Sequence, residues 1–150
     1  MDGDRAEAAH GPASVRTART AAALIVGNEI LSGKVRDANL TELAGTLRGL
    51  GIELVRAVVV ADAHDEIASE IQSARSRCDV VFTSGGVGPT HDDVTIAAAA
   101  TAFGVEVTVS EAMTRLLREH YGARFRAEHL RMARVPAGAT RSLHTRHPAP

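Results

Sequence analysis

The sequence predicts an α/β fold with a mostly parallel central sheet. Apolar runs of strand length alternate along the chain with segments of helical periodicity, and the strand candidates are continuously apolar. Alternating strands and helices are typical of a parallel sheet whose strands are connected by helices. Continuously apolar strands, rather than strands that alternate apolar and polar residues, indicate burial on both faces of that sheet.

The first half of the chain contains two strand candidates and one long helix candidate. Residues 21–26 form a continuous apolar run that is long enough for a buried strand, and residues 27–33 are expected to form a loop or short turn. A helix is expected from Asp37, a suitable N-cap, to about Leu50, because leucines recur there at helical spacing. Gly51 is suited to ending this helix, and residues 52–60 form the second strand candidate.

The second half continues the alternation. Residues 65–77 place Ile67, Ile71 and Ala74 on one helical face, and residues 79–83 form the third strand candidate. A helix is expected over residues 93–103, ended by Gly104, and a short strand over residues 105–109. Ser110 is a suitable N-cap for a further helix. No structure is assigned to residues 128–134, and residues 136–150 are expected to be loop or disordered.

The composition is that of a soluble globular protein, with 150 residues, 45% of them hydrophobic and 23% charged. We expect one domain over residues 20–140, preceded by a disordered arm (1–19) and followed by an irregular tail (141–150). Because aromatic residues make up only 3% and no apolar run has the length of a membrane span, neither nucleic acid nor a membrane is expected as a partner. A single cysteine and the absence of a secretory signal favour a cytoplasmic location.

A glycine-rich stretch, Thr83 to Thr95, carries the main functional signal. Gly85, Gly86 and Gly88 follow the third strand candidate, and Asp92 and Asp93 come where the next helix is expected to begin. Glycines allow backbone N–H groups to approach a ligand closely, and a loop that leads into a helix suits a phosphate. Adjacent carboxylates repel a phosphate unless a divalent metal lies between them. The stretch therefore predicts a phosphorylated ligand together with a metal.

The predicted topology brings further carboxylates to the same place. Ligands of parallel α/β sheets bind outside the carboxyl ends of the strands. The first strand candidate is followed by Glu29 and the second by Asp62, while Asp92 and Asp93 follow the third. We therefore expect these four side chains to converge at one edge of the sheet. Two plainer interpretations stay open, with Asp62 as a turn residue and Asp92 or Asp93 as a helix cap.

Several motifs in one order resemble a known family. They are Ile25-Val26-Gly27-Asn28-Glu29-Ile30-Leu31-Ser32-Gly33, Asp37-Ala38-Asn39, Val60-Ala61-Asp62 and Thr83-Ser84-Gly85-Gly86-Val87-Gly88-Pro89-Thr90-His91-Asp92-Asp93-Val94-Thr95. Together they resemble the molybdopterin-binding (MogA/MoaB-like) domain, in the version found at the N-terminus of CinA and of eukaryotic FAD synthases. The resemblance covers about residues 20–140 and implies a three-layer α/β/α domain that forms dimers or trimers.

The resemblance also implies roles for individual residues. Asp62 and Asp93 match the catalytic acids, and with Asp92 they are the expected ligands of a divalent metal, Mg²⁺ first, with Co²⁺ or Mn²⁺ as alternatives. The expected ligand-binding residues come from all three loops and are Gly27, Glu29, Asn39, Ser84, Gly85, Gly86, Gly88, Thr90 and His91. The first loop often carries Asp or Thr where this chain has Asn28. The family usually continues past Pro136 with a strand and a Pro-Gly loop, and we expect that this element is missing here or that the chain is shortened.

Three functions remain open at this point. In the first, the domain binds a phosphorylated pterin or nucleotide with a divalent metal, as in molybdenum cofactor biosynthesis, and its activity would resemble that of a molybdopterin adenylyltransferase. Alternatively it is a CinA-like, metal-dependent pyrophosphohydrolase of a nucleotide such as ADP-ribose or FAD. The third alternative is a non-catalytic remnant that binds a ligand or oligomerises.

Overall fold

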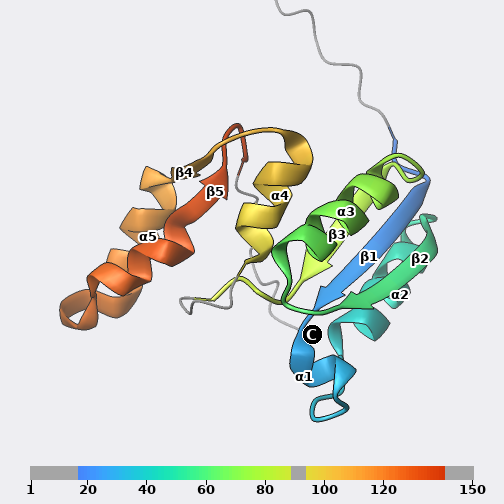
Figure 1. Ribbon diagram of the computed structural model, residues 1–150, viewed down its shortest axis with the longest axis horizontal. Helices are drawn as coiled ribbons and strands as arrows, with labels where there is room; N and C mark the ends of the chain where they lie inside the picture. Colours follow the sequence, from blue (N-terminus) through green and yellow to red (C-terminus); the bar gives the residue numbers. More distant parts are fainter. Residues whose placement is uncertain (1–16, 89–93, 141–150) are drawn as a thin grey trace, which may run out of the picture.

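The computed structural model describes residues 17–88 and 94–140. These residues form a central sheet with helices on both faces and a smaller sheet beside it (Figure 1). The elements in chain order are β1 (Thr20–Val26), α1 (Asn28–Leu31), α2 (Asn39–Gly49), β2 (Glu53–Val60), α3 (His64–Arg75), β3 (Val80–Ser84), α4 (Thr95–Phe103), β4 (Val107–Val109), α5 (Glu111–Tyr121), the 3₁₀ helices η1 (Gly122–Arg124) and η2 (Ala127–Ala133), and β5 (Arg134–Pro136).

The central sheet has three parallel strands in the order β2-β1-β3. β1 lies in the middle and its residues from Ala21 to Val26 are all buried, as its continuous apolar run predicts. β2 differs from that expectation, because its side chains alternate and Val55 and Val59 are exposed. An edge strand has a neighbour on one side only, so the burial of both faces holds for β1 and not for β2.

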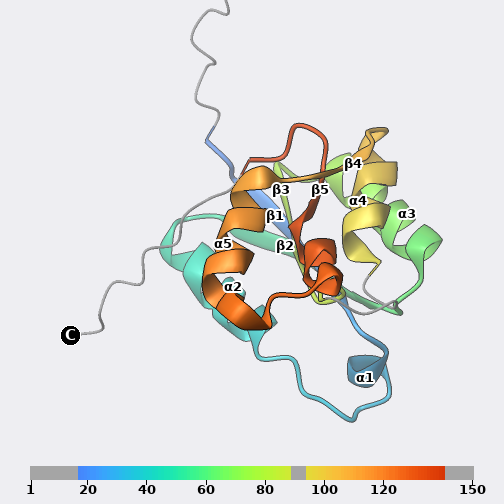
Figure 2. The same cartoon turned by 90° about the vertical axis from the view of Figure 1, so that its left-hand side faces the viewer.

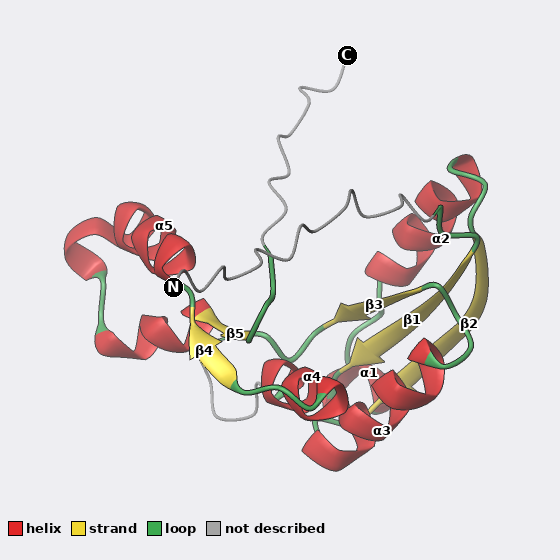
Figure 3. Cartoon of the chain, turned by 90° about the horizontal axis from the view of Figure 1, so that it is seen from above, coloured by secondary structure: helices red, strands yellow, loops and turns green. Residues whose placement is uncertain are grey.

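The helices cover the two faces of the sheet unequally (Figure 3). α2 lies on one face, and α3 and α4 lie together on the other. Because side chains alternate along a strand, Leu24 and Val26 of β1 point towards α3 and α4. They form the main core cluster with Val60, Ile67, Ala68, Ile71, Ala98 and Ala102. The alanines of α4 let this helix approach closely, and the resulting arrangement confirms the predicted α/β fold with helices on both faces of a parallel sheet.

The fourth predicted strand, over residues 105–109, exists as β4, but it does not belong to the parallel sheet. β4 does not extend the parallel sheet but pairs antiparallel with β5, with Val109 opposite Arg134. Figure 2 looks onto this part of the molecule, where β5 contacts α4 as well as β4. β5 includes Pro136, which was expected to lie in a loop, and the unassigned residues before it form η2. Strands of three residues show no usable periodicity, so the sequence pattern could not indicate this pairing.

The predicted helix ends agree with the structure to within about two residues. The Asp37 carboxylate accepts a hydrogen bond from the Leu40 N–H at 2.7 Å, so it caps α2 even though the helix begins at Asn39. Ser110 accepts the Met113 N–H at 3.3 Å and caps α5. Gly104 ends α4 in the left-handed conformation, with φ of 66°. α4 begins at Thr95, two residues later than predicted.

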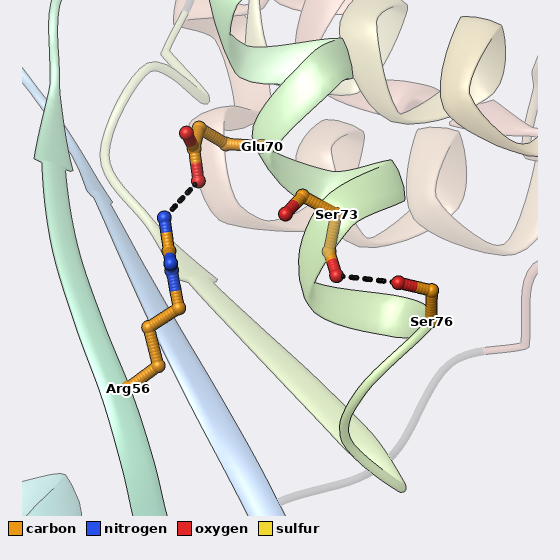
Figure 4. Close-up of polar contacts among 4 residues, drawn as sticks. All are labelled: Arg56, Glu70, Ser73 and Ser76. Atoms are coloured by element: carbon orange, nitrogen blue, oxygen red, sulfur yellow. Dashed lines mark hydrogen bonds and ion pairs between the residues drawn. The ribbon is translucent and has the colours of Figure 1, made fainter.

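An ion pair joins the edge strand β2 to α3 (Figure 4). The Arg56 guanidinium lies 2.9 Å from the Glu70 carboxylate, and at the end of the same helix the Ser76 hydroxyl donates to the Ser73 carbonyl. Both charged side chains are only partly exposed, at 38% and 27%. A charge that points inward from an edge strand also opposes unwanted strand pairing there.

Most of the predicted arm and all of the predicted tail lie outside the described residues. Arg19 is described, and its N–H donates to the Asp79 carboxylate at 2.9 Å. Across the described parts of the chain, no helix has the length and apolarity needed to cross a membrane.

Candidate functional site

The carboxyl ends of the three parallel strands lie at one edge of the sheet, as the topology predicts. Val26 pairs with Val60, and Ile25 pairs with Ser84, so the three strands end at nearly the same level. The Gly27 N–H donates to the Val60 carbonyl at 3.0 Å and continues the ladder beyond β1. The loops that carry Glu29, Asp62 and the described glycines therefore start side by side.

Asp62 holds the first loop in place. Its Oδ2 accepts a hydrogen bond from the Asn28 N–H at 2.9 Å, at the first residue of α1. Among the described residues its other oxygen, Oδ1, accepts no hydrogen bond. The carboxylate is half-buried. Asp62 thus acts as an anchor for a turn, as the plainer interpretation of the sequence has it, and a ligand role for its second oxygen stays a prediction.

Glu29 lies over the same loop. A Cβ placed on Gly27 would lie 2.7 Å from the Glu29 Oε1, so the glutamate side chain folds back across the glycine. Gly27 is buried and its N–H is already bonded to Val60. A side chain at position 27 would therefore displace the Glu29 carboxylate from this position.

The first two glycines of the glycine loop are locked against β1 and α4. Gly85 and Gly86 have φ of 95° and 62°, which favours glycine. A Cβ on Gly85 would overlap the Val26 carbonyl oxygen, and a Cβ on Gly86 would overlap the Thr95 hydroxyl. The backbone of this loop can therefore lie against its neighbours only because both residues lack a side chain.

Thr95 is a site residue to which sequence reasoning assigned no role. It is 2% exposed, its hydroxyl donates to the Gly85 carbonyl at 2.9 Å, and its N–H donates to the Gly86 carbonyl at 3.1 Å. The first N–H of α4 is thus occupied by the loop. The available signal was a threonine at the start of a helix directly after a glycine loop, a position at which hydroxyl side chains commonly bond to nearby backbone.

Asn39 and Ser84 come together at the other side of the site. The Asn39 amide, at the first residue of α2, donates to the Ser84 hydroxyl at 2.7 Å. They line a small cavity of about 170 Å³ with Ile25, Leu43 and Phe82, on the face of the sheet that α2 covers. The two residues were predicted as ligand-binding without any expected contact between them.

The remaining predicted site residues, Thr90, His91, Asp92 and Asp93, lie outside the described residues. Within the described ranges, no group of three or more His, Cys, Asp or Glu side chains could hold a metal ion. Mg²⁺ commonly binds through one or two carboxylates together with phosphate oxygens of a ligand. The hard oxygen donors of Glu29 and Asp62 fit that kind of site.

The fold and the site define a class: α/β domains with a glycine loop and carboxylates at the carboxyl edge of a parallel sheet. The family follows from comparison with known proteins. The chain belongs to the family described as the probable molybdopterin binding domain, whose model matches residues 22–147.

Named relatives and solved structures agree with this assignment. The chain is 40% identical to a CinA-like protein of Myxococcus xanthus over 77% of its own length and 28% of the relative. It is 46% identical to a probable FAD synthase of Caenorhabditis briggsae over 62% of its length and 18% of the relative. The crystal structure of CinA from Thermoplasma acidophilum matches with a TM-score of 0.75 and 34% identity, covering 80% of this chain and 72% of that one.

The MogA/MoaB resemblance is also confirmed. The tungsten cofactor synthesizing protein MoaB from Pyrococcus furiosus matches with a TM-score of 0.56 and 26% identity, covering 73% of this chain and 68% of that one. The chain spans less than half the length of several curated relatives, among them proteins of three Pyrobaculum species, of which it covers 44%, 47% and 45%.

Proposed function

We propose that this domain binds a phosphorylated pterin or nucleotide together with a divalent metal, as in molybdenum cofactor biosynthesis. The observation that carries the proposal is the juxtaposition at the sheet edge. Asp62, with one oxygen that has no partner among the described residues, lies beside a first loop that carries Glu29. The glycine loop leaves β3 at the same edge. Carboxylates and a glycine loop suit a metal–phosphate pair.

Each residue has a distinct part in this proposal. The backbone of the glycine loop, with Gly85, Gly86 and Gly88, is the part that would hold the ligand phosphate. Gly85 and Gly86 allow this loop to pack against Val26 and Thr95, and Thr95 bonds to both of their carbonyls. Asp62 and Glu29 contribute oxygen ligands to the metal, with Asp92 and Asp93 as further predicted ligands. A bound Mg²⁺ would neutralise phosphate charge and act as a Lewis acid.

A second candidate function is a metal-dependent nucleotide pyrophosphohydrolase that acts on ADP-ribose or FAD. The observation that favours it is the greater likeness to the CinA structure, at a TM-score of 0.75, than to MoaB, at 0.56. In this candidate the same acids, Asp62 and Asp93, would position an attacking water near the metal. The two candidates share the site and differ in whether a pyrophosphate bond is broken.

The test replaces the Asp62 carboxylate while retaining its structural hydrogen bond. An amide at this position can still accept the Asn28 N–H, so Asp62→Asn removes the charge without releasing α1. We expect Mg²⁺-dependent binding of ADP-ribose, FAD and pyrophosphate, measured by calorimetry, to weaken by about tenfold or more. Glu53→Gln is the matched control, because Glu53 is an exposed carboxylate at the opposite end of β2.

The outcomes separate the candidates. Release of AMP by the unmodified chain, lost in Asp62→Asn, supports the pyrophosphohydrolase. Binding without AMP release supports the pterin or nucleotide-binding domain. Equal affinity of the unmodified chain and of Asp62→Asn for every probe contradicts the site assignment and leaves the non-catalytic remnant.

We also propose that the chain forms a homo-oligomer, a dimer or trimer. The exposed apolar side chains Val55 and Val59 lie on the outer strand of the central sheet, at 48% and 37% exposure. Leu50, at the end of α2, is 69% exposed. Exposed apolar residues on an edge strand favour contact with another chain.

A further inference from the structure

A histidine closes the start of η2. Arg126, the N-cap residue of η2, donates its backbone N–H to the Nδ1 of His129 at 2.8 Å, and the His129 N–H donates to the Arg126 carbonyl at 3.1 Å. In many helices the side chain of a Glu or Gln three residues after the N-cap makes this contact. An imidazole, unlike an amide, changes its charge between about pH 5 and 8. The closure of η2 therefore depends on a group that titrates.

The hydrogen bond determines the protonation state of the His129 ring. A backbone N–H can only donate, so the Nδ1 that accepts it carries no proton, and the proton of the neutral ring lies on Nε2. A proton added to Nδ1 turns the acceptor into a donor and leaves two N–H groups facing each other. The closed arrangement thus excludes this proton, and by linkage a lower pH favours the open arrangement.

Aromatic rings keep the imidazole in place independently of this hydrogen bond. The Tyr121 ring, at the end of α5, stacks on the His129 ring with centroids 4.0 Å apart and planes inclined by 11°. The Phe125 ring lies 5.7 Å from the His129 ring. An aromatic face also attracts a cation, so the imidazolium can stay on Tyr121 after it has lost the backbone N–H. We therefore expect protonation to release the start of η2 without expelling the ring.

The charged groups around the ring do not hold an imidazolium. Among the described residues, no carboxylate forms an ion pair with His129. The Arg126 guanidinium donates to the carbonyls of Ala123 and Phe125, and the Arg118 guanidinium lies 5.1 Å from the centre of the Phe125 ring. The other titratable or charged side chains at this end of α5, η1 and η2 are Glu119, His120, Arg124, Glu128 and Arg131. The loss of the hydrogen bond is therefore the direct effect of the proton.

The segment that His129 closes is also one wall of a cavity. This cavity, of about 380 Å³, lies between α4, α5, η2 and β5, and Met132 of η2 and Met113 of α5 both line it. At the other end of η2, the Ala133 carbonyl accepts the Ser110 N–H at 2.8 Å, directly before α5. Because this end stays bonded, release of the start of η2 would change the position of the Met132 wall.

We propose that His129 is a pH-dependent latch. As a neutral ring it closes the start of η2, and as an imidazolium it releases this start and with it one wall of the cavity. The inference rests on α5, η1 and η2 alone. It does not depend on the proposed ligand site at the edge of the central sheet, so each can fail without the other.

The experiment follows the Arg126 amide proton and the Met132 methyl group of the whole chain by NMR from about pH 8 to pH 5. The chain has only three methionines, so the methyl spectrum is simple to assign. On lowering the pH we expect the Arg126 amide proton to lose the downfield shift of a hydrogen-bonded proton. The Met132 methyl signal should move with the same midpoint as the ring protons of His129.

Three variants assign the effect to the Nδ1 atom. His129→Gln supplies an acceptor that does not titrate, so the Arg126 amide should keep its bonded position at every pH. His129→Phe retains a ring on Tyr121 but has no acceptor, so the unbonded position is expected at every pH. His120→Gln is the matched control, because His120 meets the edge of the Tyr121 ring at 4.9 Å and has no part in the hydrogen bond. It should titrate as the unmodified chain does.

Two results would overturn the latch: an Arg126 amide proton that keeps its position across the pH range in the unmodified chain, or the same pH-dependent shift in His129→Gln. A Met132 methyl signal that stays unchanged while the Arg126 amide moves would overturn the link to the cavity wall. The comparison uses the pH range over which circular dichroism shows a folded chain, so that unfolding by acid is not mistaken for release of η2.

Discussion

Replacing Gly85 by alanine tests the packing of the glycine loop directly. The residue has φ of 95°, and a side chain in that region costs about 1–2 kcal/mol. Its Cβ would overlap the Val26 carbonyl oxygen, which belongs to the buried central strand and cannot move aside like a side chain. Overpacking of this kind costs a further 1–3 kcal/mol or so. We therefore expect Gly85→Ala to lower the free energy of unfolding by about 2–5 kcal/mol.

The assay is urea denaturation followed by far-ultraviolet circular dichroism, because the chain has no tryptophan. Gly104→Ala is the matched control: Gly104 has φ of 66°, but a Cβ there would meet nothing within 4 Å. Only the backbone cost of about 1–2 kcal/mol should appear in this control. If Gly85→Ala is no less stable than Gly104→Ala, the close approach of the loop to β1 is refuted.

Three further predictions concern stability and association. Glu70→Gln, which neutralises the ion pair with Arg56, should lower the free energy of unfolding by at most about 1 kcal/mol in urea denaturation, since both side chains are partly exposed; a larger loss would contradict this. Asp79→Ala removes the acceptor of three hydrogen bonds from the start of β1 and should cost about 1–2 kcal/mol in the same assay, and unchanged stability would show that these bonds contribute nothing. If the chain forms the proposed oligomer, Val59→Lys should reduce it to a monomer in sedimentation velocity, whereas Val105→Lys, at the same 37% exposure, should not; identical behaviour of the two would contradict an interface at β2.

The parts of the structure that follow from local pattern could be predicted from the sequence. β1 is a continuous apolar run, and the end of α4 at Gly104 follows from the need for a left-handed residue. The convergence of the loops that carry Glu29 and Asp62 follows from parallel topology alone, because parallel strands end at the same edge.

The parts that depend on contacts between distant segments could not be predicted. β4 and β5 have three residues each and are separated by α5, so neither shows a period that reveals its partner. The hydrogen bond between Asn39 and Ser84 joins the start of α2 to the end of β3, and the two residues are 45 positions apart in the sequence. The role of Thr95 was hidden for a different reason, since a hydroxyl at the start of a helix has several possible backbone partners.

If a ligand binds the second oxygen of Asp62, as proposed above, its binding would be linked to the first loop through the hydrogen bond that the other oxygen accepts. One oxygen of this carboxylate accepts the Asn28 N–H, at the first turn of the four-residue helix α1. A metal–phosphate ligand held through the other oxygen would restrain the carboxylate, and with it the hydrogen bond that keeps this turn closed. Amide hydrogens exchange with solvent through such local openings. The hydrogen-exchange rate of the Asn28 amide therefore reports on ligand binding at the sheet edge. This rate should fall when a ligand binds there.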